Sequence, residues 1–163
     1  MDLETLALAV DEQIRVPAAE RRSGRLYAVR SEPPTADGVV LELLAEGEAR
    51  TLPQQVRPPA GVRAIALASG VWAAPLDDDG PDRPPSRHPQ RRRAHLTVLV
   101  GVENGRDGVE VSVLRYGDGA PAVLRGGVGL IHQRLLRCWS RRPDRPGAAP
   151  AGASGQEVTN EPR

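Results

Sequence analysis

The chain has 163 residues, enough for one domain of ordinary size and a tail, and its 22 basic and 21 acidic residues give a formal net charge of +1. Every basic residue is arginine, and the absence of lysine excludes Schiff-base chemistry, a pyridoxal phosphate anchor and a Walker-type phosphate loop. The single cysteine, Cys138, excludes an internal disulfide and any site built from several cysteines.

The first predicted element is a short amphipathic helix that ends before Pro17. Asp2 occupies its N-cap position, and Asp11 falls among the charged residues on the side where we expect solvent. Its apolar residues recur at helical spacing: Leu3, Leu6, Ala7, Val10 and Ile14. The N-terminus is acidic where a secretory signal is basic, and no apolar run reaches the length of about 18 residues that spans a membrane. We therefore expect a cytoplasmic protein without membrane association.

Three strand-like segments follow. Residues 25–30 and 39–45 favour a hairpin around a proline-rich loop. Residues 62–72 predict a central strand with a bulge at Gly70, and helix is the alternative because alanine and leucine favour it. Residues 54–60 are interrupted by prolines and should be irregular.

The central feature is a β-hairpin predicted over residues 95–118, in which two alternating apolar runs meet at Asn104-Gly105. A type I′ turn there brings the valines of both runs to one face, because side chains alternate with a period of two. It pairs Glu103 with Arg106, Val100 with Val109, and Val98 with Val111. A four-residue loop keeps these faces and pairs Val102 with Val109. The other face is mixed, so we expect it to be wet and the sheet to be antiparallel.

The chain closes with a predicted edge strand over 122–125, a glycine-rich turn from Gly126 to Gly129, and a helix. The apolar face of that helix consists of Val128, Ile131, Leu135, Cys138 and Trp139. Residues 140–163 have too few large apolar side chains to offset the entropy of ordering, so we predict a disordered tail. Together, the elements predict a single α+β domain over residues 1–139. Its five- or six-stranded, mainly antiparallel sheet should carry the N- and C-terminal helices on one face.

The order of these segments resembles a group of uncharacterised small proteins from actinobacteria and their phages. The resemblance covers roughly residues 2–139. Its marks are the short N-terminal helix, Leu26-Tyr27-Ala28-Val29, Ala66-Leu67-Ala68 leading to Trp72, the segment from Ser86 to Arg92 before a valine-rich hairpin, and the terminal helix. It implies the layout above, and it implies no catalytic residues because the group has no assigned activity.

The strongest functional candidate is the long Asp/Arg-rich loop predicted over 75–93. Its arginines, with His88 among them, form a candidate anion site, because each guanidinium group can donate two parallel hydrogen bonds to the oxygens of a phosphate or carboxylate. These residues are Arg87, His88, Arg91, Arg92 and Arg93. From Asp77 to Arg93, however, five arginines accompany four aspartates, so a solvated and self-paired loop is the alternative interpretation. Trp72, which ends the central strand beside this loop, is a candidate for the mouth of a pocket.

Other classes of function find less support. The near-neutral charge and the four Trp and Tyr rings argue against nucleic acid, and Ser69, Ser86 and His88 lack any local hydrolase signature. His88 and His95 lack metal-ligand spacing, so we predict no metal site, no cofactor and no catalytic residue. Elimination leaves a small non-enzymatic protein that binds another protein or assembles with itself. The alternatives are anion or nucleic-acid binding through 87–93, and an unrecognised hydrolase that uses His88.

Overall fold

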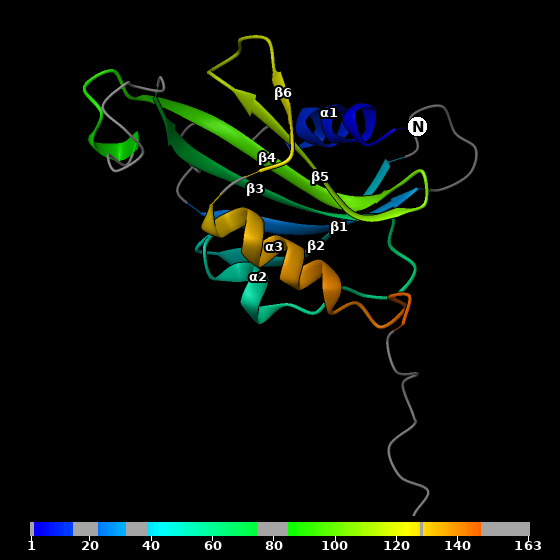
Figure 1. Cartoon of the computed structure of the whole chain (residues 1–163). Coiled ribbons are helices and arrows are strands. Elements are labelled where there is room, and N and C mark those ends of the chain that lie inside the picture. Colours follow the sequence, from blue (N-terminus) through cyan, green and yellow to red (C-terminus); the bar gives the residue numbers. More distant parts are fainter. Residues whose placement is uncertain (1, 15–22, 32–38, 75–84, 128, 148–163) are drawn as a thin grey trace, which may run out of the picture.

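The computed structural model describes residues 2–14, 23–31, 39–74, 85–127 and 129–147. They form a six-stranded sheet with helices on both sides (Figure 1). The elements in chain order are α1 (Leu3–Gln13), β1 (Gly24–Ser31), β2 (Val39–Gly47), α2 (Leu52–Gln55), β3 (Ala64–Ala73), the 3₁₀ helix η2 (Pro85–Arg87), β4 (Arg92–Glu103), β5 (Arg106–Arg115), β6 (Ala122–Arg125) and α3 (Leu130–Ser140).

The sheet has the strand order β2-β1-β3-β4-β5-β6, and every neighbouring pair is antiparallel. This arrangement confirms the predicted α+β class, the β1–β2 hairpin and the short edge strand β6. Residues 64–73 form strand β3, so the helix alternative is wrong for this segment. The predicted bulge at Gly70 is also wrong, because Gly70 pairs with His95 in an unbroken register. Gln54 and Gln55, the first two residues of the segment predicted to be irregular over 54–60, belong to the short helix α2.

The β4–β5 hairpin has the predicted turn but a different register. Asn104 and Gly105 have φ values of 50° and 74°, as a type I′ turn requires, and Glu103 pairs with Arg106. Val102 has no partner in β5, and the register shifts there by one residue. The observed partners are therefore Gly101 with Val109, Val100 with Glu110, and Leu99 with Val111, so both predicted valine pairings are wrong.

The two long helices pack on opposite faces of the sheet, which corrects the prediction that both cover one face (Figure 1). Because of the shift at Val102, the valines of β4 and those of β5 point to opposite sides. Val111 and Val113 of β5 pack with α1, whereas Val98 and Val100 of β4 pack with α3. Each face of the sheet therefore has its own apolar core and its own helix, and neither is the wet face that the sequence suggested.

The folded part reaches beyond residue 139, where the predicted domain ends. Nε1 of Trp139 donates a hydrogen bond of 2.7 Å to Oδ1 of Asp107, and the buried Arg142 donates to the same oxygen at 2.8 Å. The guanidinium of Arg142 also lies 4.0 Å from the centre of the Trp139 ring. These contacts connect the C-terminal end of α3 to the start of β5. Residues 148–163, most of the predicted tail, lie outside the described residues.

The glycine-rich turn before α3 joins β6 to that helix, as predicted. A Cβ atom added to Gly127 would lie 1.9 Å from Nδ1 of His132, so only glycine leaves room for the imidazole. The turn therefore serves packing, and His132 lies where the helix meets β5.

Candidate functional site

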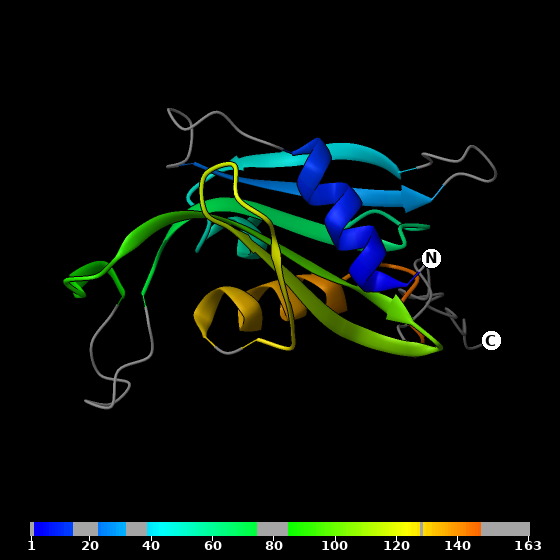
Figure 2. The same cartoon turned by 90° about the horizontal axis from the view of Figure 1, so that it is seen from above.

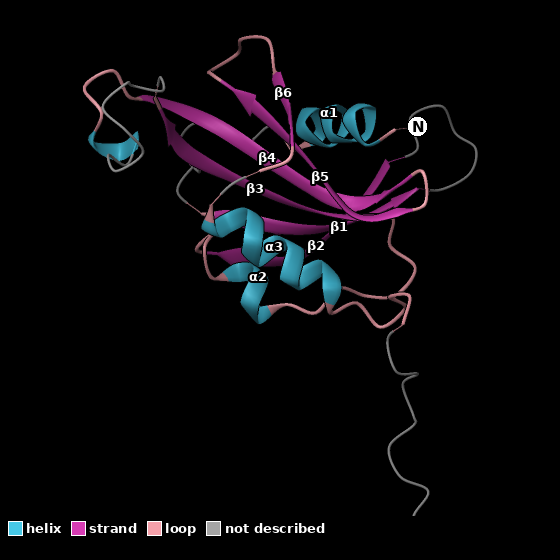
Figure 3. Cartoon of the chain, viewed as in Figure 1, coloured by secondary structure: helices cyan, strands magenta, loops and turns pink. Residues whose placement is uncertain are grey.

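The predicted loop over 75–93 is shorter in the described structure, because its last two residues belong to β4. Residues 75–84, with the aspartates expected to neutralise the arginines, lie outside the described residues. Pro85–Arg87 form η2, and β4 starts at Arg92. Seen from above, β3 and β4 extend beyond their neighbours on this side (Figure 2). The 3₁₀ helix η2 lies near their ends, as the side view also shows (Figure 3).

Trp72 and two of the predicted arginines come together at the ends of β3 and β4. Trp72 is opposite Arg93 in the β3–β4 register, and its side chain is 36% exposed. The guanidinium carbon of Arg93 lies 4.2 Å from the centre of the indole ring, and that of Arg91 lies 5.1 Å from it. Both distances suit cation–π interactions, which hold the guanidinium groups near the ring.

Arg92 makes a separate stack. Its guanidinium carbon lies 4.6 Å from the centre of the Tyr116 ring. Because successive residues of a strand point to opposite faces, Arg92 and Arg93 leave β4 on different sides. The start of β4 thus carries an arginine–aromatic stack on each face.

His88, unlike the neighbouring arginines, has a structural role. It is buried, and its Nδ1 accepts a hydrogen bond of 2.9 Å from the backbone N–H of Gln90. The carbonyl oxygen of His88 also accepts from the backbone N–H of Arg91. His88 therefore shapes the turn that leads into β4, and this geometry lends no support to a role as an exposed general base.

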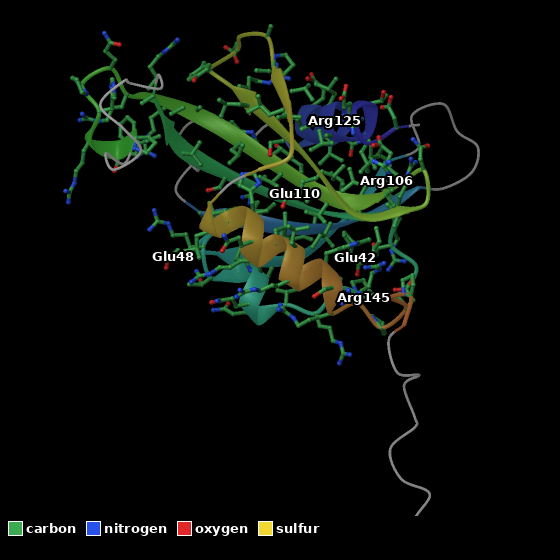
Figure 4. The ribbon with its side chains drawn as sticks, in the orientation of Figure 1. Glu42, Glu48, Arg106, Glu110, Arg125 and Arg145 are labelled. Atoms are coloured by element: carbon green, nitrogen blue, oxygen red, sulfur yellow. The ribbon has the colours of Figure 1, made fainter. Side chains whose placement is uncertain are left out.

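A pocket of about 340 Å³ lies beside the Trp72 stack. It opens between the end of β3, the turn after β2, η2 and the first turn of α3. Its lining residues are Glu48, Ala49, Arg50, Ser69, Gly70, Val71, Trp72, Pro85, Ser86, Arg93 and Ile131. Figure 4 shows Glu48 at this end of the molecule and Arg106 at the other. Sequence reasoning identified Trp72 and Arg93 but missed Arg50, because only the tertiary fold brings the turn after β2 to this place.

The arginines around the pocket have no carboxylate partners within the described part of the chain. No Asp or Glu oxygen lies within 4.0 Å of the side-chain nitrogens of Arg50, Arg87, Arg91, Arg92 or Arg93 among the described residues. All five are exposed. This end of the sheet therefore presents positive charge that the described residues leave uncompensated.

Under α1, by contrast, an arginine is paired with a buried carboxylate. Asp11 is fully buried there, although the helical pattern predicted that it faces solvent. Its Oδ2 accepts hydrogen bonds from Nε and Nη2 of Arg115 at 3.0 and 2.9 Å, and its Oδ1 accepts one of 3.0 Å from Thr97. Nδ1 of His95 lies 3.3 Å from the same Oδ1. Burial alone raises the pKa of Asp11, but the hydrogen bonds from His95, Arg115 and Thr97 outweigh it and leave the pKa below its usual value. We interpret this cluster as an anchor that holds α1 on the sheet.

A further polar cluster lies on the α3 face. Nδ1 of His132 is 3.1 Å from Oε2 of Glu110, while Oε1 of Glu110 and Oγ of Ser112 are buried without a hydrogen-bond partner. An activated serine needs contact with a base. Ser112 has no such contact in the described structure, so the three residues do not form a hydrolase triad there.

Comparisons with known proteins add no assignment: no family model, no curated protein and no solved structure matches the chain. The resemblance to the actinobacterial and phage group therefore stays a prediction. Within the described ranges, no three His, Cys, Asp or Glu side chains are grouped to hold a metal ion. None of the described helices has the length and apolar character needed to cross a membrane.

Proposed function

We propose that the protein is a non-enzymatic binding domain that takes an anionic group into the pocket between Arg50 and Arg93. The observation that carries the proposal is that both arginines line one pocket, while neither has a carboxylate partner among the described residues. An anion supplied by a ligand would provide the missing countercharge. The partner, whether a small molecule or a macromolecule, would be recognised through that group.

The chemistry of the lining favours phosphate or carboxylate oxygens. Guanidinium groups donate paired hydrogen bonds to either kind of anion. The hydroxyl of Ser69 donates to the carbonyl oxygen of Gly70, so Ser86 is the better placed of the two serines to donate to a ligand. Two arginines against one Glu48 leave the lining with a net charge of +1.

The size of the pocket limits what enters it. Its volume of about 340 Å³ lies near the lower end of the range for ligand sites, which is about 300–1,000 Å³. A single anionic group with a short attached segment suits this space better than a large cofactor does. The rest of a larger partner would lie outside, against Trp72 and the exposed arginines.

Isothermal titration calorimetry of the protein with inorganic phosphate and with citrate, at low ionic strength, tests the proposal. We expect at least one of the two anions to bind, and Arg50→Gln and Arg93→Gln each to weaken that binding about tenfold or more, since a hydrogen bond to a charged group contributes about 1.5–3 kcal/mol. Arg106→Gln is the matched control, because it removes the same charge from an exposed arginine at the start of β5, at the opposite end of the β4–β5 hairpin from the pocket. Absence of binding by both anions, or equal loss in all three variants, would contradict the proposal.

A further inference from the structure

The positive surface continues beyond the pocket along the segment that leads into β4. An anion held by Arg50 and Arg93 leaves the charges of Arg87, Arg91 and Arg92 without a countercharge from the described residues. These residues occupy positions 87, 91 and 92, from the end of η2 to the start of β4. A series of cations along one segment suits a partner with repeating negative charge better than it suits one isolated anion.

The aromatic side chains of this end accompany the arginines. Trp72 stacks with Arg91 and Arg93, and Tyr116 stacks with Arg92. Nucleic-acid bases stack both on aromatic rings and on guanidinium planes. The same end therefore offers groups for phosphates and groups for bases, with the Trp72 stack on one face of β4 and the Tyr116 stack on the other.

The character of the surface argues against a protein partner here. The centre of a protein interface is mostly apolar, whereas nucleic-acid interfaces are more polar and far more basic. Among the described residues of η2 and of the adjoining ends of β3 and β4, Trp72 is the only exposed large apolar side chain. Arg87, Arg91, Arg92 and Arg93 are all exposed at this end, and the other exposed apolar residues, Pro85 and Pro89, are small.

The elements at this end also favour single strands over duplex. In the described structure the local helix is η2, which has three residues and is too short to fill a major groove. Stacking on Trp72 or Tyr116 requires bases that are unpaired and turned outward. A single strand can present them without the cost of opening a duplex.

From these observations we infer that the anionic partner is single-stranded nucleic acid. One phosphate enters the pocket between Arg50 and Arg93, neighbouring phosphates meet Arg87, Arg91 and Arg92, and bases stack at Trp72 and Tyr116. The inference rests on the proposed function, because it uses the same pocket as the anchor for one phosphate.

Fluorescence anisotropy with a labelled oligothymidylate of about 12 nucleotides tests this inference on the full chain, since single-strand binding folds span about 4–16 nucleotides. We expect saturable binding, with the logarithm of the binding constant falling by about 0.7 per phosphate contact for each tenfold rise in salt. Arg91→Gln and Arg92→Gln should each weaken binding, whereas Arg106→Gln should weaken it less. Trp72→Ala should weaken it about fivefold or more, and Trp72→Phe should restore most of the loss because the ring is kept.

The outcomes separate the two proposals. Binding of inorganic phosphate without binding of the oligonucleotide would overturn this inference and leave the anion pocket standing. A duplex of the same length bound as tightly as the single strand, or a polyglutamate peptide bound as tightly, would also overturn it. Absence of binding by phosphate, by citrate and by the oligonucleotide would overturn the inference together with the proposed function.

Discussion

Arg115 and Arg93 show two uses of arginine in one sheet. Arg115, at the end of β5, is only 7% exposed and donates two hydrogen bonds to Asp11, with Glu12 also 3.5 Å away. Arg93, at the start of β4, is exposed, lies over Trp72, and has no carboxylate partner among the described residues. The first arginine is neutralised by the fold itself. The second has no countercharge among the described residues, and this difference locates the candidate site.

The same substitution at both arginines should give the largest contrast. Arg115→Gln leaves the buried Asp11 carboxylate without its main cation, so we expect the free energy of unfolding to fall by about 3–5 kcal/mol, as when one partner of a buried ion pair is removed. Arg93→Gln should change it by no more than about 0.5 kcal/mol, as surface substitutions usually do. Urea denaturation followed by circular dichroism measures both values.

For phosphate affinity, the two substitutions should have effects in the reverse order. Arg93→Gln should lose phosphate affinity, whereas Arg115→Gln, measured where it is still folded, should keep it. A large loss of stability in Arg93→Gln, or an equal loss of affinity in both variants, would remove the distinction between the two regions.

The second prediction concerns acid. The pKa of Asp11 in the folded protein lies below its usual value of 3.8, so between these two values the unfolded chain binds more protons than the folded one. The stabilising contribution of Asp11 is therefore complete above the unfolded pKa and is lost as pH falls below about 3.8 towards the folded pKa. Its hydrogen-bonded surroundings are Arg115, His95 and Thr97, with Glu12 nearby across Arg115.

Asp11→Asn tests this dependence because asparagine does not titrate. Below about pH 4, the slope of unfolding free energy against pH should be smaller in the variant by up to about 1.4 kcal/mol per pH unit, the value for one proton. Among the described residues, Asp2, Glu103 and Asp107 also have lowered pKa values, and they contribute to the slope that remains. Identical slopes in the two proteins would show that Asp11 does not carry this part of the acid sensitivity.

The fold could be predicted from the sequence to the level of its strands, because alternation and turn residues act locally. The Asn104-Gly105 turn and β6 are examples. The placement of the helices could not, since it depends on a bulge in which Asp107 and Gly108 of β5 lie opposite the single residue Val102 of β4. Gly108, with a φ of 73°, is a local signal for that bulge, but it does not tell which residue of β4 lies opposite. Because the β4–β5 register shifts by one residue, the valines of β5 lie on the α1 face and those of β4 lie on the α3 face. The two helices therefore cover opposite faces of the sheet.

The candidate site was predictable only in part, for a similar reason. Trp72 ends one predicted strand, and the arginines at 91–93 precede the next. The local composition and the predicted strand ends were therefore enough to identify them as candidates. Arg50 reaches the pocket from the turn after β2, through tertiary packing alone. Asp11 was assigned to solvent because a charged residue on a helix usually faces water, and only the buried partners Thr97 and Arg115 explain its position.

The central claim is that the uncompensated arginines at the β3–β4 end bind anions, and nuclear magnetic resonance tests it most directly. Backbone amide shifts would be followed while inorganic phosphate is added at constant ionic strength. We predict saturable shifts concentrated at residues 48–50, 69–72 and 85–93, with little change at Arg106 or around Asp11. Shifts spread evenly over the exposed arginines, or centred on the paired Arg115 region, would contradict it.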